Sequence, residues 1–228
     1  MAVDAASEKR HRPGVQAVAA AVAVVGTLGG LWALGEAQGN SGDTGPATCS
    51  PSHDKRVSKR VSAQQLCTAL NRPDLPALLG APQEQAETAY GSESSVEDAD
   101  GTKTAAPQAE VDTKTYSVKL EASEDDLPVS DMAGLLGPSA QSRKVLGHPA
   151  VLYSNHTIAF NINLGSGKIG DTGTGGVAHH LLVAADRKDG GRSFEIAIWR
   201  QDDVTPDEAT LYRIAERVLP TVPGWKAG

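Results

Sequence analysis

The sequence is poor in aromatic and basic residues, and both shortages argue against a nucleic-acid partner. Aromatic side chains make up 4% of the 228 residues, too few for a visible platform on which single strands would stack. Lys and Arg together number 21 against 28 for Asp and Glu, a formal net charge of −7. Because nucleic-acid phosphates are neutralised by a basic footprint, we expect no nucleic-acid partner.

Charge is missing altogether from one run near the N-terminus, Val15–Leu34. As a helix, a run of this length covers the roughly 30 Å of a bilayer core. Basic residues at 9–12 precede the run and none follows directly, which places the N-terminus inside. We predict a cytoplasmic N-terminus over 1–13 and a transmembrane signal anchor over 14–35. The alternative is a cleaved signal peptide, cut near 35–37, that leaves a secreted domain.

Two glycines inside this run, Gly26 and Gly30, have the spacing that lets two membrane helices approach closely. A homodimer through these glycines is one interpretation. The other is that glycine is simply common in such helices. In both, the rest of the chain lies outside the cytoplasm, as a flexible tether over 36–58 and a folded domain over 59–228.

Cysteine occurs twice, at Cys49 and Cys67. Two cysteines exclude a zinc site with four Cys ligands and a dense disulfide framework. Outside the cytoplasm a free thiol would be oxidised, so we predict a disulfide that attaches the end of the tether to the first helix. The Cys-x-x-Cys spacing of redox proteins is absent, which makes a redox role the less favoured alternative.

Hydrophobic periodicity predicts an α+β domain. Ser62 and Gln65 form a capping box for a first helix, and Thr205 with Pro206 is expected to begin the last one. Alternation with period two predicts strands, and these follow one another directly, so the sheet should be mostly antiparallel with flanking helices. The expected strands are 116–121, 145–153 with a break at Gly147, 157–164, 177–185 and 194–199, and a short helix is expected at 130–136.

Motifs that carry chemistry are incomplete. Gly165–Gly170 matches the spacing of a dinucleotide fingerprint, but more loop-forming residues follow where a helix should begin, so we expect a strand-to-strand loop. Asp171 belongs to an Asp-Thr-Gly tripeptide of the aspartic-peptidase type without a second copy. His179 and His180 would face opposite sides of a strand and cannot chelate one ion together. Asp98–Gly101 fails as an EF-hand loop at both ends.

No catalytic, cofactor-binding or metal-binding residue is therefore predicted, and we expect a binding or interaction domain of the cell envelope rather than an enzyme. An envelope hydrolase that uses Asp171 or His179/His180 is one alternative, and a regulatory subunit of another membrane protein is a second. The segment from Glu84 to Asp131 contains 13 acidic and 3 basic residues. It is either a solvated acidic surface or a surface for a basic partner or for cations.

Several stretches of the domain together resemble a known family. They are Val61–Gly80, Gly101–Thr104, Asp126–Pro128, Val145–Tyr153, Ala197–Asp203 and Val218–Trp225. Over most of residues 60–228 the chain resembles domain-of-unknown-function family 6215, an actinobacterial (Streptomyces-type) group of single-pass membrane proteins. The resemblance implies one N-terminal span and an extracytoplasmic domain, and it carries over no site residues. The order of elements is also similar to the PsbP-like class of antiparallel sheets with helices.

Overall fold

The computed structural model describes residues 45–50, 55–97, 101–163 and 168–227, and it describes the side chains of these residues except at 159–163 and 168–172. The predicted cytoplasmic N-terminus (1–13) and membrane helix (14–35), with Gly26 and Gly30, lie outside this part of the chain. Within the described part, no helix is both long and apolar enough to span a membrane.

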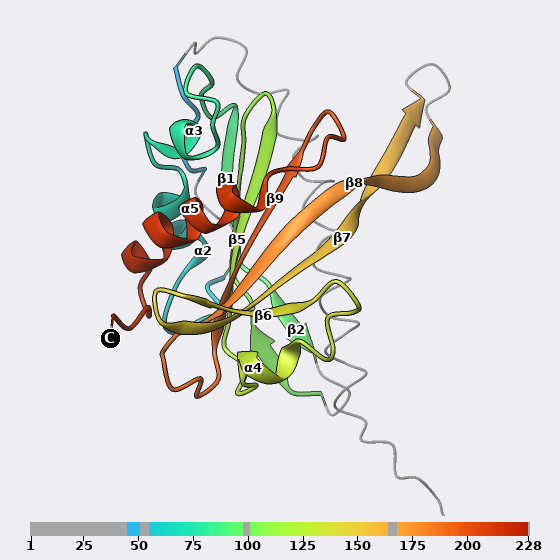
Figure 1. Cartoon of the computed structure of the whole chain (residues 1–228). Helices are drawn as coiled ribbons and strands as arrows, with labels where there is room; N and C mark the ends of the chain where they lie inside the picture. The colour runs from blue at the N-terminus through green and yellow to red at the C-terminus, as the bar shows by residue number, and fades with distance from the viewer. Residues whose placement is uncertain (1–44, 51–54, 98–100, 164–167, 228) are drawn as a thin grey trace, which may run out of the picture.

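The domain is built on one antiparallel sheet of seven strands in the order β1-β4-β5-β9-β8-β7-β6 (Figure 1). Every neighbouring pair in it is antiparallel. Its strands are β1 (Thr88–Ser92), β4 (Gln108–Asp112), β5 (Tyr116–Ser123), β6 (Gln141–Val145), β7 (His148–Asn163), β8 (Lys168–Ala184) and β9 (Ser193–Arg200). A separate hairpin of β2 (Ser95–Glu97) and β3 (Lys103–Ala105) connects β1 to β4. The predicted α+β class and the mostly antiparallel sheet are confirmed.

Helices cover the two faces of the sheet unequally. The helices α2 (Ala63–Leu70) and α5 (Glu208–Val218) lie on one face, where they close the main core with α3 (Leu75–Leu78) and the 3-10 turn η1 (Leu219–Thr221) (Figure 1). The short helix α4 (Val129–Met132) lies on the other face. There it covers one end of β7 and β8 with a small cluster: Val129, Met132, Val151, Leu182 and Ala184.

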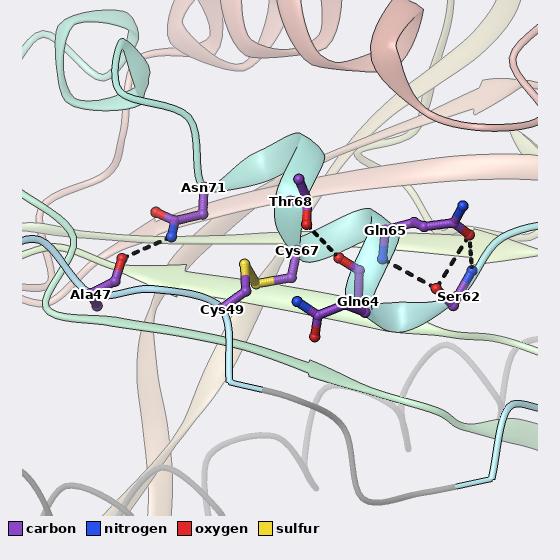
Figure 2. Close-up of a disulfide and its surroundings, with 8 residues drawn as sticks. All are labelled: Ala47, Cys49, Ser62, Gln64, Gln65, Cys67, Thr68 and Asn71. Atoms are coloured by element: carbon purple, nitrogen blue, oxygen red, sulfur yellow. Dashed lines mark hydrogen bonds between the residues drawn. A yellow bond between two sulfur atoms is a disulfide. The ribbon is translucent and has the colours of Figure 1, made fainter.

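The first helix begins as its sequence predicts. The Ser62 hydroxyl accepts a hydrogen bond from the Gln65 backbone, and the Gln65 side chain accepts one from the Ser62 backbone (Figure 2). Cys67 is fully buried on this helix and is joined to Cys49 by a disulfide, as predicted. The residues around Cys49 pair with the domain, because Ser50 forms a parallel bridge with Tyr90 of β1.

Part of the predicted tether (36–58) therefore belongs to the folded domain. Ala47 donates its backbone N–H to Ala86 and accepts a hydrogen bond from the Asn71 side chain. Ser58 is buried, and its hydroxyl donates to Glu124 over 2.5 Å. Composition alone does not show this, because polar segments can be held by hydrogen bonds without a periodic apolar pattern.

Two local predictions were wrong. The N-cap of α5 is Asp207, whose carboxylate accepts from the Ala209 backbone, and Thr205 lies outside the helix. The glycine-rich segment 168–176 is not a loop, because it forms the outer half of β8 and pairs with β7. At Gly175 the two strands approach so closely that only glycine fits, because a Cβ there would lie 2.3 Å from the Thr157 hydroxyl oxygen.

The strand expected at 145–153 is split into two. Leu146 and Gly147 both have positive φ angles, 52° and 83°, and they form the tight turn between β6 and β7. A turn of two residues with positive φ matches the twist of the strands it joins. The predicted break at Gly147 is thus a complete hairpin, which adds β6 as the edge strand of the sheet.

Candidate functional site

A row of directly paired residues crosses the sheet on the face opposite α2 and α5. Alternation along each strand places these residues on that face, since their chain neighbours Ala89, Val118 and Leu181 belong to the main core. In spatial order the row consists of Tyr90, Glu110, Lys119, Ala197, His180 and Tyr153. Polar side chains thus run from the edge strand β1 across the middle of the sheet to β7.

Residues two positions further along the same strands lie on the same face and extend this row. Gln108 and Glu121 are cross-strand partners, as are Glu121 and Glu195, while Asp112 and Asn155 lie two residues from Glu110 and Tyr153. We call the following set the polar sheet face: Tyr90, Gln108, Glu110, Asp112, Lys119, Glu121, Tyr153, Asn155, His180 and Glu195. Its charged groups are half-buried, so their mutual interactions are screened less than on an open surface.

His180 is held on this face by oxygen acceptors at both ring nitrogens. Its Nδ1 lies 2.8 Å from Glu195 Oε1, and its Nε2 lies 2.8 Å from Asn155 Oδ1. The ring also stacks on Tyr153 with a centroid separation of 4.6 Å, and the Tyr153 hydroxyl donates to Glu195 over 3.0 Å.

Two carboxylates on adjacent strands have opposite pKa shifts. Burial raises the pKa of Glu121, and the nearby charge of Glu195 raises it further despite an ion pair of 2.9 Å with Lys119. Burial also acts to raise the pKa of Glu195, but the hydrogen bond and charge of His180 outweigh it and lower that pKa. Glu195 is therefore the carboxylate that the fold keeps ionised.

Glu110 is another acid of the set whose pKa is raised. Burial, together with the charge of Asp112, raises the pKa of Glu110 to about 7, and hydrogen bonding to Tyr90 only partly opposes this. The pKa of Tyr90 is raised by burial and by the same two carboxylates. Asp112 itself accepts hydrogen bonds from the hydroxyls of Thr88 and Ser117.

Gln108 contributes an unsatisfied acceptor next to these acids. The residue is 9% exposed, and its buried Oε1 accepts no hydrogen bond from the part of the chain that the structure describes. Buried side-chain oxygens without a partner are uncommon in folded proteins and call for an explanation. Register places Gln108 directly opposite Glu121, on the polar sheet face.

The histidines singled out in the sequence do not come together. His179 lies on the opposite face from His180, with its Nδ1 2.7 Å from the Ser154 hydroxyl. His148 is buried, bonded to the Ala184 carbonyl and stacked on Trp225 at 3.9 Å, a packing role. The side chain of Asp171 and the residues Asp98–Asp100 lie outside what the structure describes. Among the described residues, no three His, Cys, Asp or Glu side chains are grouped so as to hold a metal ion.

One comparison with known proteins gives a match. A family of unknown function, DUF6215, matches residues 8–139, more than half of the chain. The chain belongs to this family. No curated protein and no solved structure matches it.

The DUF6215 match covers a different range from the stretches within residues 60–228 on which the sequence resemblance was based. It begins at residue 8, so it takes in the uncharged run 15–34, and it ends before β6. The stretches at 145–153, 197–203 and 218–225 lie beyond it. Of the polar sheet face, the DUF6215 range includes the residues on β1, β4 and β5, whereas His180 and Glu195 lie outside it.

Sequence reasoning missed most of this site. The alternation that predicts β5 already places Lys119 and Glu121 away from the core, but β1 and β4 were not predicted. The signal in β4 is the alternation of Gln108, Glu110 and Asp112 with Ala109 and Val111. A five-residue strand offers few repeats, so this pattern is weak until its partner strands are known.

Proposed function

We propose that this protein is a membrane-anchored, extracytoplasmic binding domain of the cell envelope, and that the polar sheet face is its binding surface. The observation that carries the proposal is the position of this face in the middle of the sheet. The outer face of an antiparallel sheet is commonly polar and solvated, but here the charged groups are half-buried, and burying charge is costly unless it is paired and hydrogen-bonded.

The composition of the face favours binding over catalysis. His180 has both ring nitrogens engaged by Glu195 and Asn155, which leaves neither nitrogen available to activate a nucleophile. A hydrolase based on Asp171 or His179/His180 has little support, because His179 and His180 lie on opposite faces. A binding surface needs only fixed polar groups, which the network supplies.

Three features support a membrane anchor with the folded domain outside the cytoplasm. The uncharged run 15–34 falls inside the range that DUF6215 matches. The disulfide between Cys49 and Cys67 fits an oxidising compartment. Basic residues precede the run, which favours an N-terminus on the cytoplasmic side. A secreted form, released by cleavage near 35–37, is the alternative.

The length of the tether then limits the reach of the domain. If the membrane helix ends at residue 35 and the domain begins at 45, the connecting residues span at most about 35 Å when fully extended. The binding surface would work close to the membrane, so its ligand would be a membrane-proximal component. A homodimer through Gly26 and Gly30, a regulatory role towards another membrane protein and a PsbP-like sandwich architecture are compatible proposals.

Topology is tested by cysteine labelling of the full chain in cells. Gly42→Cys lies between the predicted helix and the domain, and Ser7→Cys is the matched control before the helix. The native cysteines are disulfide-bonded and do not react. A membrane-impermeant maleimide should label Gly42→Cys in intact cells and Ser7→Cys only after permeabilisation. The reverse pattern would overturn the proposed orientation.

Binding by the face is tested by photocrosslinking in native membranes. A photoreactive phenylalanine replaces Trp199, which is the cross-strand partner of Ser117 at the edge of the polar sheet face. The matched control replaces Tyr212 on α5, an aromatic residue on the other side of the sheet. A discrete adduct is expected from position 199 only. Equal adducts from both positions, or none from either, would contradict the proposal.

A further inference from the structure

The two edges of the seven-stranded sheet differ in whether the chain itself covers them. At the β1 edge, Ser50 forms a parallel bridge with Tyr90 and donates its backbone N–H to Ala89 over 3.1 Å. At the other edge, no strand within the described ranges pairs with the outer side of β6. An uncovered edge strand presents unpaired N–H and C=O groups to other chains. The β6 edge is therefore the one that an incoming strand can reach.

The hairpin between β6 and β7 decides which backbone groups of β6 face outward. Its two-residue turn makes Val145 and His148 the pair that exchanges backbone hydrogen bonds. The direction alternates along a strand, so Ser142 and Lys144 point their N–H and C=O groups away from β7. In agreement, the Ser142 carbonyl accepts a hydrogen bond from the Arg143 guanidinium over 3.1 Å. Neither outward N–H has an acceptor among the residues that the structure describes.

The side chains along this edge are exposed and basic, although the whole chain has a net charge of −7. Arg143 and Lys144 project from opposite faces of β6, and neither forms an ion pair with the described residues. Arg143 also bonds to the side chain of Gln141. The exposed Arg187 guanidinium extends the basic surface, since it donates to the Leu146 carbonyl in the β6–β7 turn over 3.5 Å. Free backbone donors and unpaired positive charge thus occur on the same edge.

We propose that β6 binds an extended acidic segment of a partner protein, which adds to the sheet as a further strand. Main-chain hydrogen bonds to Ser142 and Lys144 supply affinity, and carboxylates on the added strand pair with Arg143 and Lys144. A lysine on an edge strand discourages pairing with other edges, so the charge that repels a second copy of β6 selects an acidic strand. No residue of β6 belongs to the polar sheet face, and the inference does not rest on the function proposed for that face.

The test is fluorescence anisotropy of a labelled peptide titrated with the full chain in mild non-ionic detergent. The probe has the sequence Thr-Val-Thr-Glu-Glu-Val-Thr-Val, whose adjacent glutamates place one carboxylate on each face of an extended strand. The charge control has Gln-Gln in place of Glu-Glu, and the backbone control has N-methyl groups on its central four residues. We expect each control to bind about fivefold more weakly, because the first lacks the ion pairs and the second lacks N–H donors.

Variants connect the binding to the edge. Lys144→Gln removes one charge and should weaken binding of the probe about threefold. Lys114→Gln is the matched control, because Lys114 is exposed in the turn between β4 and β5, and it should leave binding unchanged.

Ser142→Pro removes an outward N–H and no bond to β7, so the fold should survive and binding should weaken about fivefold. Thermal unfolding checks that the variant folds. If it does not, Lys144→Pro takes its place and is compared with Lys144→Gln.

Four results would overturn the inference. The first is that the probe does not bind, and the second is that it binds no better than its Gln-Gln control. The third is equal affinity for the probe and the N-methylated control, since binding would then need charge alone. The fourth is a Ser142→Cys variant that forms a disulfide-linked dimer and excludes the probe, because the edge would then belong to a second copy of the chain.

Discussion

Glu121 and Glu195 are direct cross-strand partners on β5 and β9, yet one has a raised pKa and the other a lowered pKa. Like charges directly opposite one another destabilise a sheet. Among the described residues, the fold gives Glu195 two donors, His180 and Tyr153, and Glu121 only the shared Lys119. The pair therefore differs in partners rather than in exposure, which is 18% for Glu121 and 19% for Glu195.

We expect Glu195→Gln to lower the stability of the domain and Glu121→Gln not to lower it. At pH 7, Glu195→Gln should lower the free energy of unfolding by about 1–3 kcal/mol, because it weakens hydrogen bonds to a charged acceptor. Glu121→Gln should be neutral or stabilising, because its ionised form is disfavoured by burial. Urea unfolding of the full chain in detergent measures both, and the same sign for both would contradict the assignment of partners.

The contribution of Glu195 to the free energy of unfolding should also depend on pH. Its pKa is lowered from the ordinary value of 4.5 in the folded state. Its stabilisation is therefore complete above 4.5 and is lost as the pH falls through the folded pKa. The difference between wild type and Glu195→Gln should accordingly shrink in acid. A difference that stays constant from pH 7 down to pH 3 would show that the side chain acts through shape and not charge.

The contribution of Glu110 to stability should change with pH in the opposite direction. Its pKa is about 7 in the folded state against 4.5 ordinarily, so the folded state binds more protons between these values. Stability should then fall as the pH rises from 4.5 to 7, and Glu110→Gln should remove this fall. The variant should be the more stable by about 1–3 kcal/mol at pH 8 and nearly equal to wild type at pH 4.5. Parallel unfolding curves for the two proteins would argue against a buried, uncompensated carboxyl.

The disulfide should stabilise the domain by restricting its unfolded state. Cys49 and Cys67 are 18 residues apart, and a loop of this size corresponds to about 3 kcal/mol in the chain-entropy description. The double variant Cys49→Ala with Cys67→Ala should lose roughly that amount in urea unfolding. Reductant should destabilise the wild type and leave the double variant unchanged, which serves as the control. Sensitivity of the double variant to reductant would point to another cause.

Gly91 should be intolerant of any side chain because α2 begins directly above β1. A Cβ at Gly91 would lie 2.6 Å from the carbonyl oxygen of Ala63, a distance that requires the helix to move. Gly91→Ala should cost about 1–3 kcal/mol, the usual effect of overpacking. Gly134→Ala is the control, since its Cβ would meet no atom within 4 Å. Similar thermal unfolding of the two variants would contradict this account of the helix–strand contact.

The amino-acid sequence by itself determined the features that depend on neighbours along the chain. The capping box of Ser62 and Gln65 forms as predicted, because a helix end is satisfied by side chains three residues away. The alternation in β5 and β9 correctly marks their core faces. The disulfide followed from there being only two cysteines. The N-cap of α5 was misplaced because Thr205 and Asp207 are both good capping residues, and local sequence does not rank them.

Only the tertiary structure decided which polar residues meet. Glu110, Lys119, Glu195 and His180 come from four strands, and their proximity depends on the order β4-β5-β9-β8 and on the antiparallel register. Period-two alternation shows which residues share the face of one strand, but it contains no information on which strand lies next to it. Strand order is set by long-range packing, and a shift of one residue in register would move every one of these side chains to the other face.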